Sequence, residues 1–229
     1  MARFTLQDPS LVDRTGLGVT VAVLDSGVYA GHPHVGRVLE GISFTDDADD
    51  VVDRLGHGTA VAAAIREKAP AVDLVTVKIF HQRLATNADV LARAIEWAAD
   101  YGAQLINLSS GTANAAHVER LTAAVGYAAA RGSLVVSAFE VSGTHLFPGS
   151  LPGVIGVLAD WSIERDALDV VPQPIGVSRF SASPYPRPIP GVPQERNLAG
   201  VSFAVANVTG FLARAIESGT VAKMMNGRA

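Results

Sequence analysis

The chain of 229 residues is 48% hydrophobic and 17% charged, enough for one large core, and a length of this order often forms a single α/β domain. A net charge of −4 and the lack of cysteine argue against a nucleic-acid or anionic-membrane partner, a disulfide framework and a cysteine zinc site. Few aromatic residues and abundant Ala and Val favour helices packed closely on a sheet.

The first residues carry no targeting pattern. Residues 1–18 include Asp8 and Asp13 and contain no basic region followed by an apolar run, unlike a signal peptide. No run reaches the roughly 18 apolar residues needed to span a bilayer. With Met1 as the natural start, we expect a cytoplasmic protein in which residues 1–17 form an N-terminal arm.

Apolar runs and helical patterns alternate along most of the chain. Runs typical of buried strands occupy 19–24, 72–80, 105–108 and 134–136, and helical patterns occupy 57–67, 90–98 and 118–128. This alternation predicts a doubly wound, mostly parallel central sheet flanked by helices, in a single compact domain. Functional residues in such sheets gather at the carboxyl ends of the strands.

The last third of the chain begins with a proline-rich stretch. Seven of the 12 prolines lie within 171–197, so residues 171–199 are predicted to form a long surface loop. That loop leads to Ser202, which begins a helix with an apolar face. Residues 218–229 are expected to be a C-terminal tail.

Three polar residues are expected to meet at one crevice. Asp25 ends a strand, His57 begins a helix between two glycines, and Ser202 begins another helix after a glycine. Amide hydrolysis needs a nucleophile, a base and a group that orients the base, and these side chains suit those roles. Each also has a purely structural explanation, because Asp and Ser cap helices and a buried histidine can simply be hydrogen bonded.

Five sequence blocks, in order, resemble those of the subtilisin-like serine peptidases, or subtilases. They are VAVLDSGV around Asp25, GHGTAVA around His57, AIEWAADYGAQLINLSSG at 94–111, FPGSLPGVIGV at 147–157 and GVSFAVANVTG around Ser202. The order Asp, His, Ser is that of subtilisin. The resemblance implies that Ser202 is the nucleophile, His57 the general base and then acid, and Asp25 the carboxylate that fixes the imidazole tautomer.

The same resemblance assigns residues to substrate binding. Ser109, Ser110 and Gly111 resemble the edge strand on which subtilases bind a peptide as an added antiparallel strand. Leu146 aligns with a position where many subtilases carry glycine at the bottom of the pocket for the residue before the cleaved bond. A leucine is expected to shorten that pocket. Residues 147–157 look like the next core strand.

The chain departs from the family at the oxyanion hole. Subtilases usually supply a side-chain donor from an asparagine, and Glu140 stands at the corresponding position, where an ionised carboxylate would repel the oxyanion. Val201 likewise replaces a typical threonine. Three explanations stay open: Glu140 is protonated and donates, it points away while backbone amides act, or the protein is catalytically weak.

We therefore predict a serine endopeptidase that hydrolyses peptide bonds through an acyl-enzyme, in limited processing of a peptide or protein substrate. The alternative, favoured by Glu140, is a pseudopeptidase that binds an extended peptide without cleaving it. A sedolisin with a Ser-Glu-Asp triad is disfavoured by His57 in its intact Gly-His-Gly-Thr block. Because the long inhibitory pro-segment of secreted relatives is missing, we expect the chain to fold unaided or with a partner protein.

No cofactor and no metal are expected. The acidic run 46–50 is interpreted as a solvated loop rather than a calcium site. His32 and His34 are close in sequence, but no cysteine or third histidine nearby completes a metal site. The segment between the helix at 57–67 and the strand at 72–80 is too short for the calcium loop of many secreted subtilases.

Overall fold

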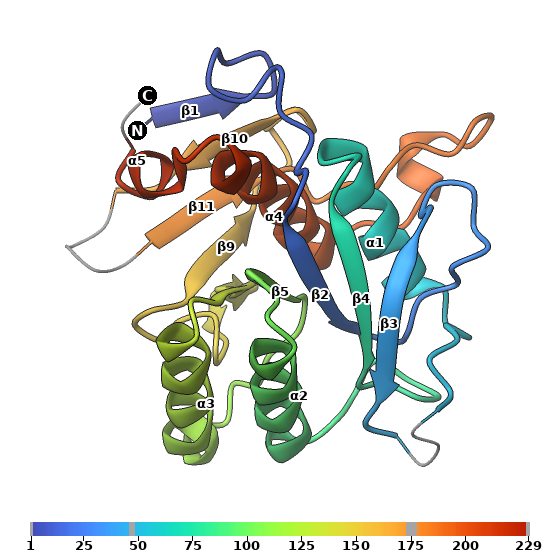
Figure 1. Cartoon of the computed structure of the whole chain (residues 1–229), viewed down its shortest axis with the longest axis vertical. Coiled ribbons are helices and arrows are strands. Elements are labelled where there is room, and N and C mark those ends of the chain that lie inside the picture. The colour runs from blue at the N-terminus through green and yellow to red at the C-terminus, as the bar shows by residue number, and fades with distance from the viewer. Residues whose placement is uncertain (1, 46–48, 173–177, 228–229) are drawn as a thin grey trace.

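A nine-stranded sheet forms the centre of the computed structural model, which describes residues 2–45, 49–172 and 178–227 (Figure 1). The strands are β1 (Ala2–Thr5), β2 (Thr20–Asp25), β3 (Val38–Ser43), β4 (Asp73–Lys78), β5 (Leu105–Leu108), β6 (Leu134–Ala138), β9 (Ile155–Ala159), β10 (Ala167–Val170) and β11 (Ser178–Ala182). Their order is β1-β10-β11-β9-β6-β5-β2-β4-β3. From β11 to β3 neighbouring strands are parallel, whereas β10 and β1 are antiparallel additions at one edge.

Helices cover both faces of this sheet. They are α1 (His57–Lys68), α2 (Ala88–Asp100), α3 (Val118–Ala130), α4 (Val201–Glu217) and α5 (Val221–Met225), with short 3-10 helices η1 (Ala115–His117) and η2 (Gln194–Arg196). The helices α1 and α4 pack on one face, and α2 and α3 pack on the other (Figure 1). The predicted doubly wound α/β domain is therefore confirmed.

The strand β2 illustrates how one short run serves both layers. Successive strand residues point to opposite faces of a sheet. Val21 and Val23 accordingly pack with α1 and α4, and Ala22 and Leu24 pack with α2 and α3. All four side chains are fully buried, which is why the run is continuously apolar.

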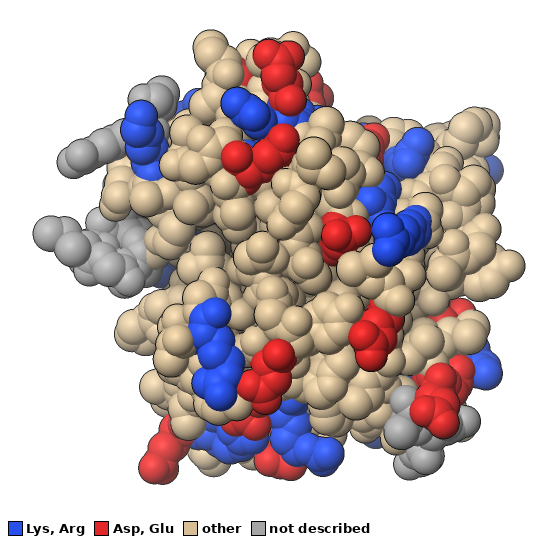
Figure 2. All heavy atoms as spheres, viewed as in Figure 1, with Lys and Arg blue, Asp and Glu red and all other residues tan. Residues whose placement is uncertain are grey.

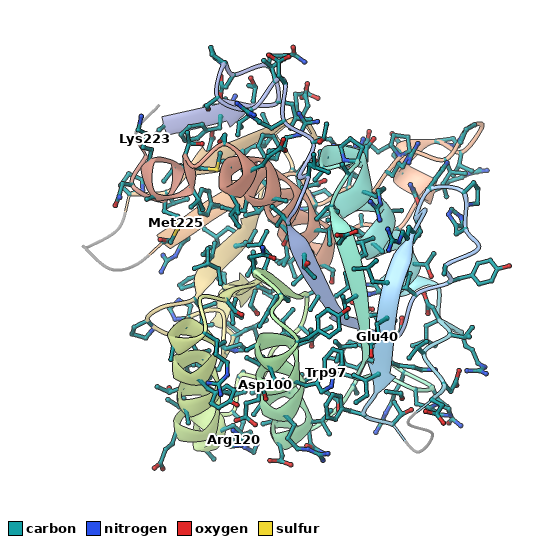
Figure 3. The ribbon with its side chains drawn as sticks, in the orientation of Figure 1. Glu40, Trp97, Asp100, Arg120, Lys223 and Met225 are labelled. Atoms are coloured by element: carbon teal, nitrogen blue, oxygen red, sulfur yellow. The ribbon has the colours of Figure 1, made fainter. Side chains whose placement is uncertain are left out.

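The solvent side of α2 and α3 carries ion pairs. Arg120 of α3 binds Glu96 of α2. Asp100, at the end of α2, binds Tyr127 of α3 and Arg131, the residue after α3. Arg120 and Asp100 are labelled in Figure 3. Exposed pairs of this kind contribute about 0–1 kcal/mol each, so apolar packing holds these helices. Charges of both signs are intermixed on the face in Figure 2. In the described parts of the chain, no helix is both long and apolar enough to cross a membrane.

The predicted surface loop at 171–199 is wrong for Ser178–Ala182. These residues form β11, which lies between β9 and β10 with Phe180 fully buried. Prolines lie on both sides of this stretch but not within it, so its N–H groups are free to join the ladder. Residues 173–177, also part of the predicted loop, lie outside the described residues.

The predicted arm and tail both contain regular structure. The strand β1 of the predicted arm, 1–17, pairs with β10, and the predicted tail, 218–229, contains α5 with a buried Met224. Elements of four or five residues are too short to show a diagnostic periodicity. The core strand expected within 147–157 begins only at Ile155.

Candidate active site

Asp25 and His57 meet at the carboxyl edge of the sheet. Asp25 is the last residue of β2 and His57 is the first residue of α1. Gly58 allows the close approach: a Cβ there would lie 2.1 Å from the carbonyl oxygen of Gly27 and 3.1 Å from the Asp25 Cβ. The glycine after His57 therefore lets the start of α1 rest directly on the end of β2.

The imidazole of His57 is hydrogen bonded to this carboxylate. His57 Nδ1 lies 2.7 Å from Asp25 Oδ1, and the Asp25 side chain is fully buried while that of His57 is 15% exposed. Burial lowers the pKa of His57, but the hydrogen bond and negative charge of Asp25, together with the charge of Asp53, outweigh it and hold that pKa above its ordinary value. A proton on Nδ1 leaves Nε2 free to accept another.

Asp53, which the sequence analysis did not single out, organises the turn before His57. Its Oδ1 accepts from Ser26 Oγ at 2.9 Å, from Leu55 N at 2.9 Å and from Gly56 N at 2.8 Å. Its Oδ2 accepts from Thr59 N at 2.8 Å and from the Thr59 hydroxyl at 2.7 Å. The N-cap Gly56 has no side chain to cap α1, so a carboxylate from three residues earlier satisfies the exposed N–H groups.

Ser202 stands at the start of α4, beside the end of β5. Its hydroxyl donates to the carbonyl oxygen of Ser109 at 3.2 Å, and the Ser109 hydroxyl donates to the Ser202 carbonyl at 3.3 Å. The next residue, Phe203, has its ring centroid 5.6 Å from that of His57. Among the described residues the Ser202 hydroxyl has no hydrogen bond to His57, so it must turn away from Ser109 to be activated.

A buried polar network fixes this arrangement from behind. Thr209 Oγ1 donates to Asn107 Oδ1 at 2.9 Å, and Asn107 Nδ2 donates to Ser109 Oγ at 3.0 Å. Asn107 and Thr209 are fully buried, so the loss of either hydrogen bond would leave unsatisfied polar groups in the core. The network ties α4 to β5 and so sets where Ser202 lies.

The predicted substrate-binding residues Ser109, Ser110 and Gly111 directly follow β5. Thr112 and Phe147 exchange two backbone hydrogen bonds of 2.9 and 2.8 Å, which places Gly111 against Leu146. A Cβ on Gly111 would be 3.0 Å from the Leu146 Cβ. A cavity of about 410 Å³ lies beside this segment and is lined in part by Ser110 and Gly111.

Glu140 belongs to a small hairpin at the end of β6. The strands β7 (Glu140–Val141) and β8 (Thr144–His145) pair across a turn in which Ser142 has a φ of 50°. Glu140 Oε2 lies 3.7 Å from His145 Nε2. The guanidinium of Arg179 stacks on Phe139 at 3.4 Å; burial lowers the pKa of Arg179, and the charge of Glu140 opposes that shift. Glu140 thus lies beside His145 and near the guanidinium of Arg179, both outside the triad.

The histidines and acidic residues considered for metal binding form no cluster. In the parts of the chain that the structure describes, no three His, Asp or Glu side chains are grouped to hold a metal ion. His32 Nδ1 accepts from the backbone N–H of His34 at 3.2 Å. Of the acidic run, residues 46–48 lie outside the described residues, and Asp50 binds Lys78 at 3.0 Å.

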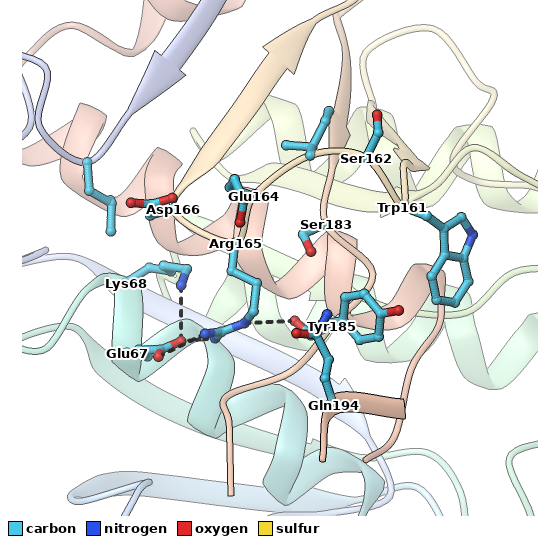
Figure 4. Close-up of a pocket in the computed structure, with 12 residues that line it drawn as sticks. Glu67, Lys68, Trp161, Ser162, Glu164, Arg165, Asp166, Ser183, Tyr185 and Gln194 are labelled. Atoms are coloured by element: carbon cyan, nitrogen blue, oxygen red, sulfur yellow. Dashed lines mark hydrogen bonds and ion pairs between the residues drawn. The ribbon is translucent and has the colours of Figure 1, made fainter. Parts of the chain in front are cut away.

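A second cavity, of about 580 Å³, lies at the far end of α1 from His57 (Figure 4). Glu67 accepts there from Lys68 at 3.0 Å and from Arg165, and Lys68 is 3% exposed. Burial and the charge of Arg165 lower the pKa of Lys68, opposed by Glu67. Glu67 pairs with both cations of this cavity, and the carboxylates of Glu164 and Asp166 also line it.

Comparisons with known proteins agree with the geometry. The model described as the subtilase family matches residues 16–159. The thermophilic serine proteinase of Bacillus sp. (strain AK1) is 32% identical over 224 residues, covering 88% of this chain and 53% of the relative. Subtilisin Savinase of Lederbergia lenta is 30% identical over 227 residues, covering 90% of this chain and 79% of the relative.

A solved structure shows the same fold. The cold adapted subtilisin-like serine proteinase superposes with a TM-score of 0.76 at 22% identity, covering 95% of this chain and 84% of that one. The present chain spans about half the length of several curated relatives, including 53% of the Bacillus proteinase.

Proposed function

Because the chain belongs to the subtilase family, we propose that it is a serine endopeptidase with Asp25, His57 and Ser202 as its catalytic triad. The observation that carries this proposal is the 2.7 Å hydrogen bond between His57 and Asp25, near a helix that begins at Val201, one residue before Ser202. That arrangement supplies a base, its orienting carboxylate and a nucleophile at one edge of the sheet.

The chemistry follows from these positions. His57 Nε2 takes the Ser202 proton as Oγ attacks the substrate carbonyl carbon, which forms a tetrahedral oxyanion. The oxyanion collapses to the acyl-enzyme, the C–N bond breaks, and His57 returns the proton to the leaving amine. Water, deprotonated by His57, then hydrolyses the ester and restores Ser202. Asp25 keeps Nδ1 protonated and stabilises the imidazolium.

Backbone N–H groups are proposed as the main hydrogen-bond donors to the oxyanion. The N–H groups in the first turn of α4 have no acceptor within the helix and carry the positive end of its dipole, so the N–H of Ser202 is a suitable donor. Glu140 could serve as an oxyanion donor only in its protonated form, because a carboxylate has no proton to donate. The contact between Glu140 and His145 supports the explanation that this carboxylate turns away.

The substrate is proposed to pair with Ser109, Ser110 and Gly111 as an added strand. Leu146 against Gly111 supports a shallow pocket that takes a small side chain before the cleaved bond. A site restricted in this way suits limited processing of a peptide or protein better than general degradation. A partner that assists folding and the cytoplasmic location both stay predictions, and cell fractionation tests the latter.

A second candidate function is peptide binding without catalysis. A peptide-binding pseudopeptidase is favoured by Glu140 at the oxyanion position and by a Ser202 hydroxyl bonded to Ser109 rather than to His57. Such a protein would use the same strand without turning over its ligand.

A fluorophosphonate probe distinguishes these functions, because it labels a serine only where a base activates it. We expect stoichiometric labelling of the parent protein at Ser202 and none of Ser202→Ala. Absence of labelling in a parent protein with a normal circular dichroism spectrum would reject the peptidase and leave peptide binding.

A further inference from the structure

A pocket of about 440 Å³ lies next to the turn that presents His57. Its walls come from three segments: residues 29–34, the start of α1 with the preceding Asp53 and Gly56, and residues 186–198. Gly56 is one residue before His57, and Leu198 is four residues before Ser202. Consecutive Cα atoms are about 3.8 Å apart, so the pocket is within reach of a peptide held at the triad.

The pocket lies on the side where the amine product would depart. Its lining includes none of Ser109, Ser110, Gly111 and Leu146, which are proposed to bind the acyl half of the substrate. His57 must protonate the leaving nitrogen, so the residues after the cleaved bond pass the His57 side of the site. They would meet the pocket wall that contains Gly56.

Apolar side chains make up much of the mouth of the pocket. Tyr29, Ile189 and Leu198 line it and are 55%, 48% and 49% exposed. Large apolar side chains left in water around a concavity are typical of a binding site. A single aliphatic or aromatic side chain would cover this surface.

The polar part of the pocket contains one guanidinium, that of Arg187, together with the imidazoles of His32 and His34 and the carboxylate of Asp53. Arg187 has no ion pair with any residue in the described ranges, and it lines the pocket with His32 and His34. Burial and then the positive charges of Arg187 and His32 lower the pKa of His34, which places the three groups together. The carboxylate of Asp53 is already engaged by five hydrogen bonds. Glu67, the other acid near His34, is paired with Arg165.

We propose that this pocket binds the leaving half of the substrate, taking an apolar side chain followed by a carboxylate that pairs with Arg187. The carboxylate is either an Asp or Glu side chain or the C-terminus of the peptide. The proposal rests on the proposed peptidase function, and it makes the residues after the cleaved bond a determinant of specificity.

The test compares substrates that share their acyl half. One pair of internally quenched peptides carries Ala-Leu-Glu or Ala-Leu-Gln after the cleaved bond, with amidated ends, and a second pair ends at Leu as free acid or amide. A p-nitroanilide with the same acyl half has no residues to enter the pocket. The variants are Arg187→Glu and Ile189→Asn, with Lys223→Glu as the charge-reversed control at an exposed position of α5 (Figure 3).

The parent should prefer Glu over Gln, or acid over amide, by on the order of fivefold in kcat/KM, as for a partly exposed ion pair. Arg187→Glu should abolish or reverse that preference, and Ile189→Asn should lower cleavage of both peptides without changing their ratio. Neither variant should change anilide hydrolysis, and Lys223→Glu should change nothing. A preference within the Glu and Gln pair would identify a side-chain carboxylate as the group bound, and a preference within the acid and amide pair would identify the C-terminus. An unaltered preference in Arg187→Glu, or an equal loss on the anilide, would overturn the proposal.

Failure of the peptidase function would be visible separately, as a parent protein that cleaves neither peptide nor anilide. Fluorescence anisotropy of labelled Ala-Leu-Glu and Ala-Leu-Gln peptides then tests the pocket without catalysis. Tighter binding of the acidic peptide that is lost in Arg187→Glu supports the pocket. Equal binding of both peptides to the parent rejects it.

Discussion

Replacing Asp53 with asparagine should lower both stability and activity, although Asp53 takes no part in the chemistry. The carboxylate accepts five hydrogen bonds with its two oxygens. Asparagine has one oxygen, so if it accepts from Thr59, its amide group faces the Ser26 hydroxyl and the N–H groups of Leu55 and Gly56. Water can reach the backbone groups at Leu55 and Gly56, which are exposed, but Ser26 is buried.

The magnitude follows from these contacts. A hydrogen bond to a charged group contributes about 1.5–3 kcal/mol, and water or the amide recovers part of what is lost here. We expect the free energy of unfolding to fall by about 2 kcal/mol, which for a domain of this size lowers Tm by about 4–8 °C. Asp13→Asn is the matched control, because Asp13 is exposed and the substitution makes the same change of charge.

The pH dependence of activity tests the role of Asp53 independently, through the direction in which the pH profile of the variant moves. The charge of Asp53 helps to raise the pKa of His57, which must be unprotonated to act as a base. Removing that charge lowers the pKa, so the acid limb of kcat/KM should move to lower pH while the plateau falls. Calorimetry and a pH–rate profile from pH 5 to 9 measure both effects. An acid limb that moves upward, or an unchanged limb with an unchanged Tm, would refute this account of Asp53.

Three further outcomes are expected. Gly58→Ala should lower kcat/KM by on the order of 100-fold in a peptide assay, because its Cβ would collide with the carbonyl of Gly27 and displace His57 by about 1 Å; unchanged kinetics would be inconsistent with the close approach. Glu140→Asn should raise turnover at pH 8 if the carboxylate faces the oxyanion, and steady-state rates equal to or below the parent's would mean that it does not. EDTA should leave activity and Tm nearly unchanged; a fall in Tm of more than about 10 °C would contradict the expected absence of a metal site.

Most strands and helices between residues 19 and 136 were predictable from sequence because their patterns are local, but the strand β3 (Val38–Ser43) was not predicted. A continuously apolar run predicted β2, and helical spacing over 90–98 predicted most of α2, which extends from Ala88 to Asp100. Asp25 and His57 were identified from their neighbouring glycines and their places at a strand end and a helix start. The structure places their side chains 2.7 Å apart.

Other features depend on contacts between distant parts of the chain. Nothing within Ser178–Ala182 indicates a central strand, because that segment becomes one only by pairing with β9 and β10. Thr209 and Asn107 are 102 residues apart, and neither reveals the other locally.

The family, the alternating layers and the residues of the proposed triad could all be inferred from the order of amino acids, because each depends on a short pattern or a motif. The folded structure was needed to show how Asp53 supports the turn before His57, where the Ser202 hydroxyl points, and which side chains surround the pocket at Arg187. Hydrogen bonds and cavities form between segments that folding brings together, and their geometry is set by the packing of α1, α4 and the 186–198 loop. That packing is a property of the whole chain rather than of any one segment.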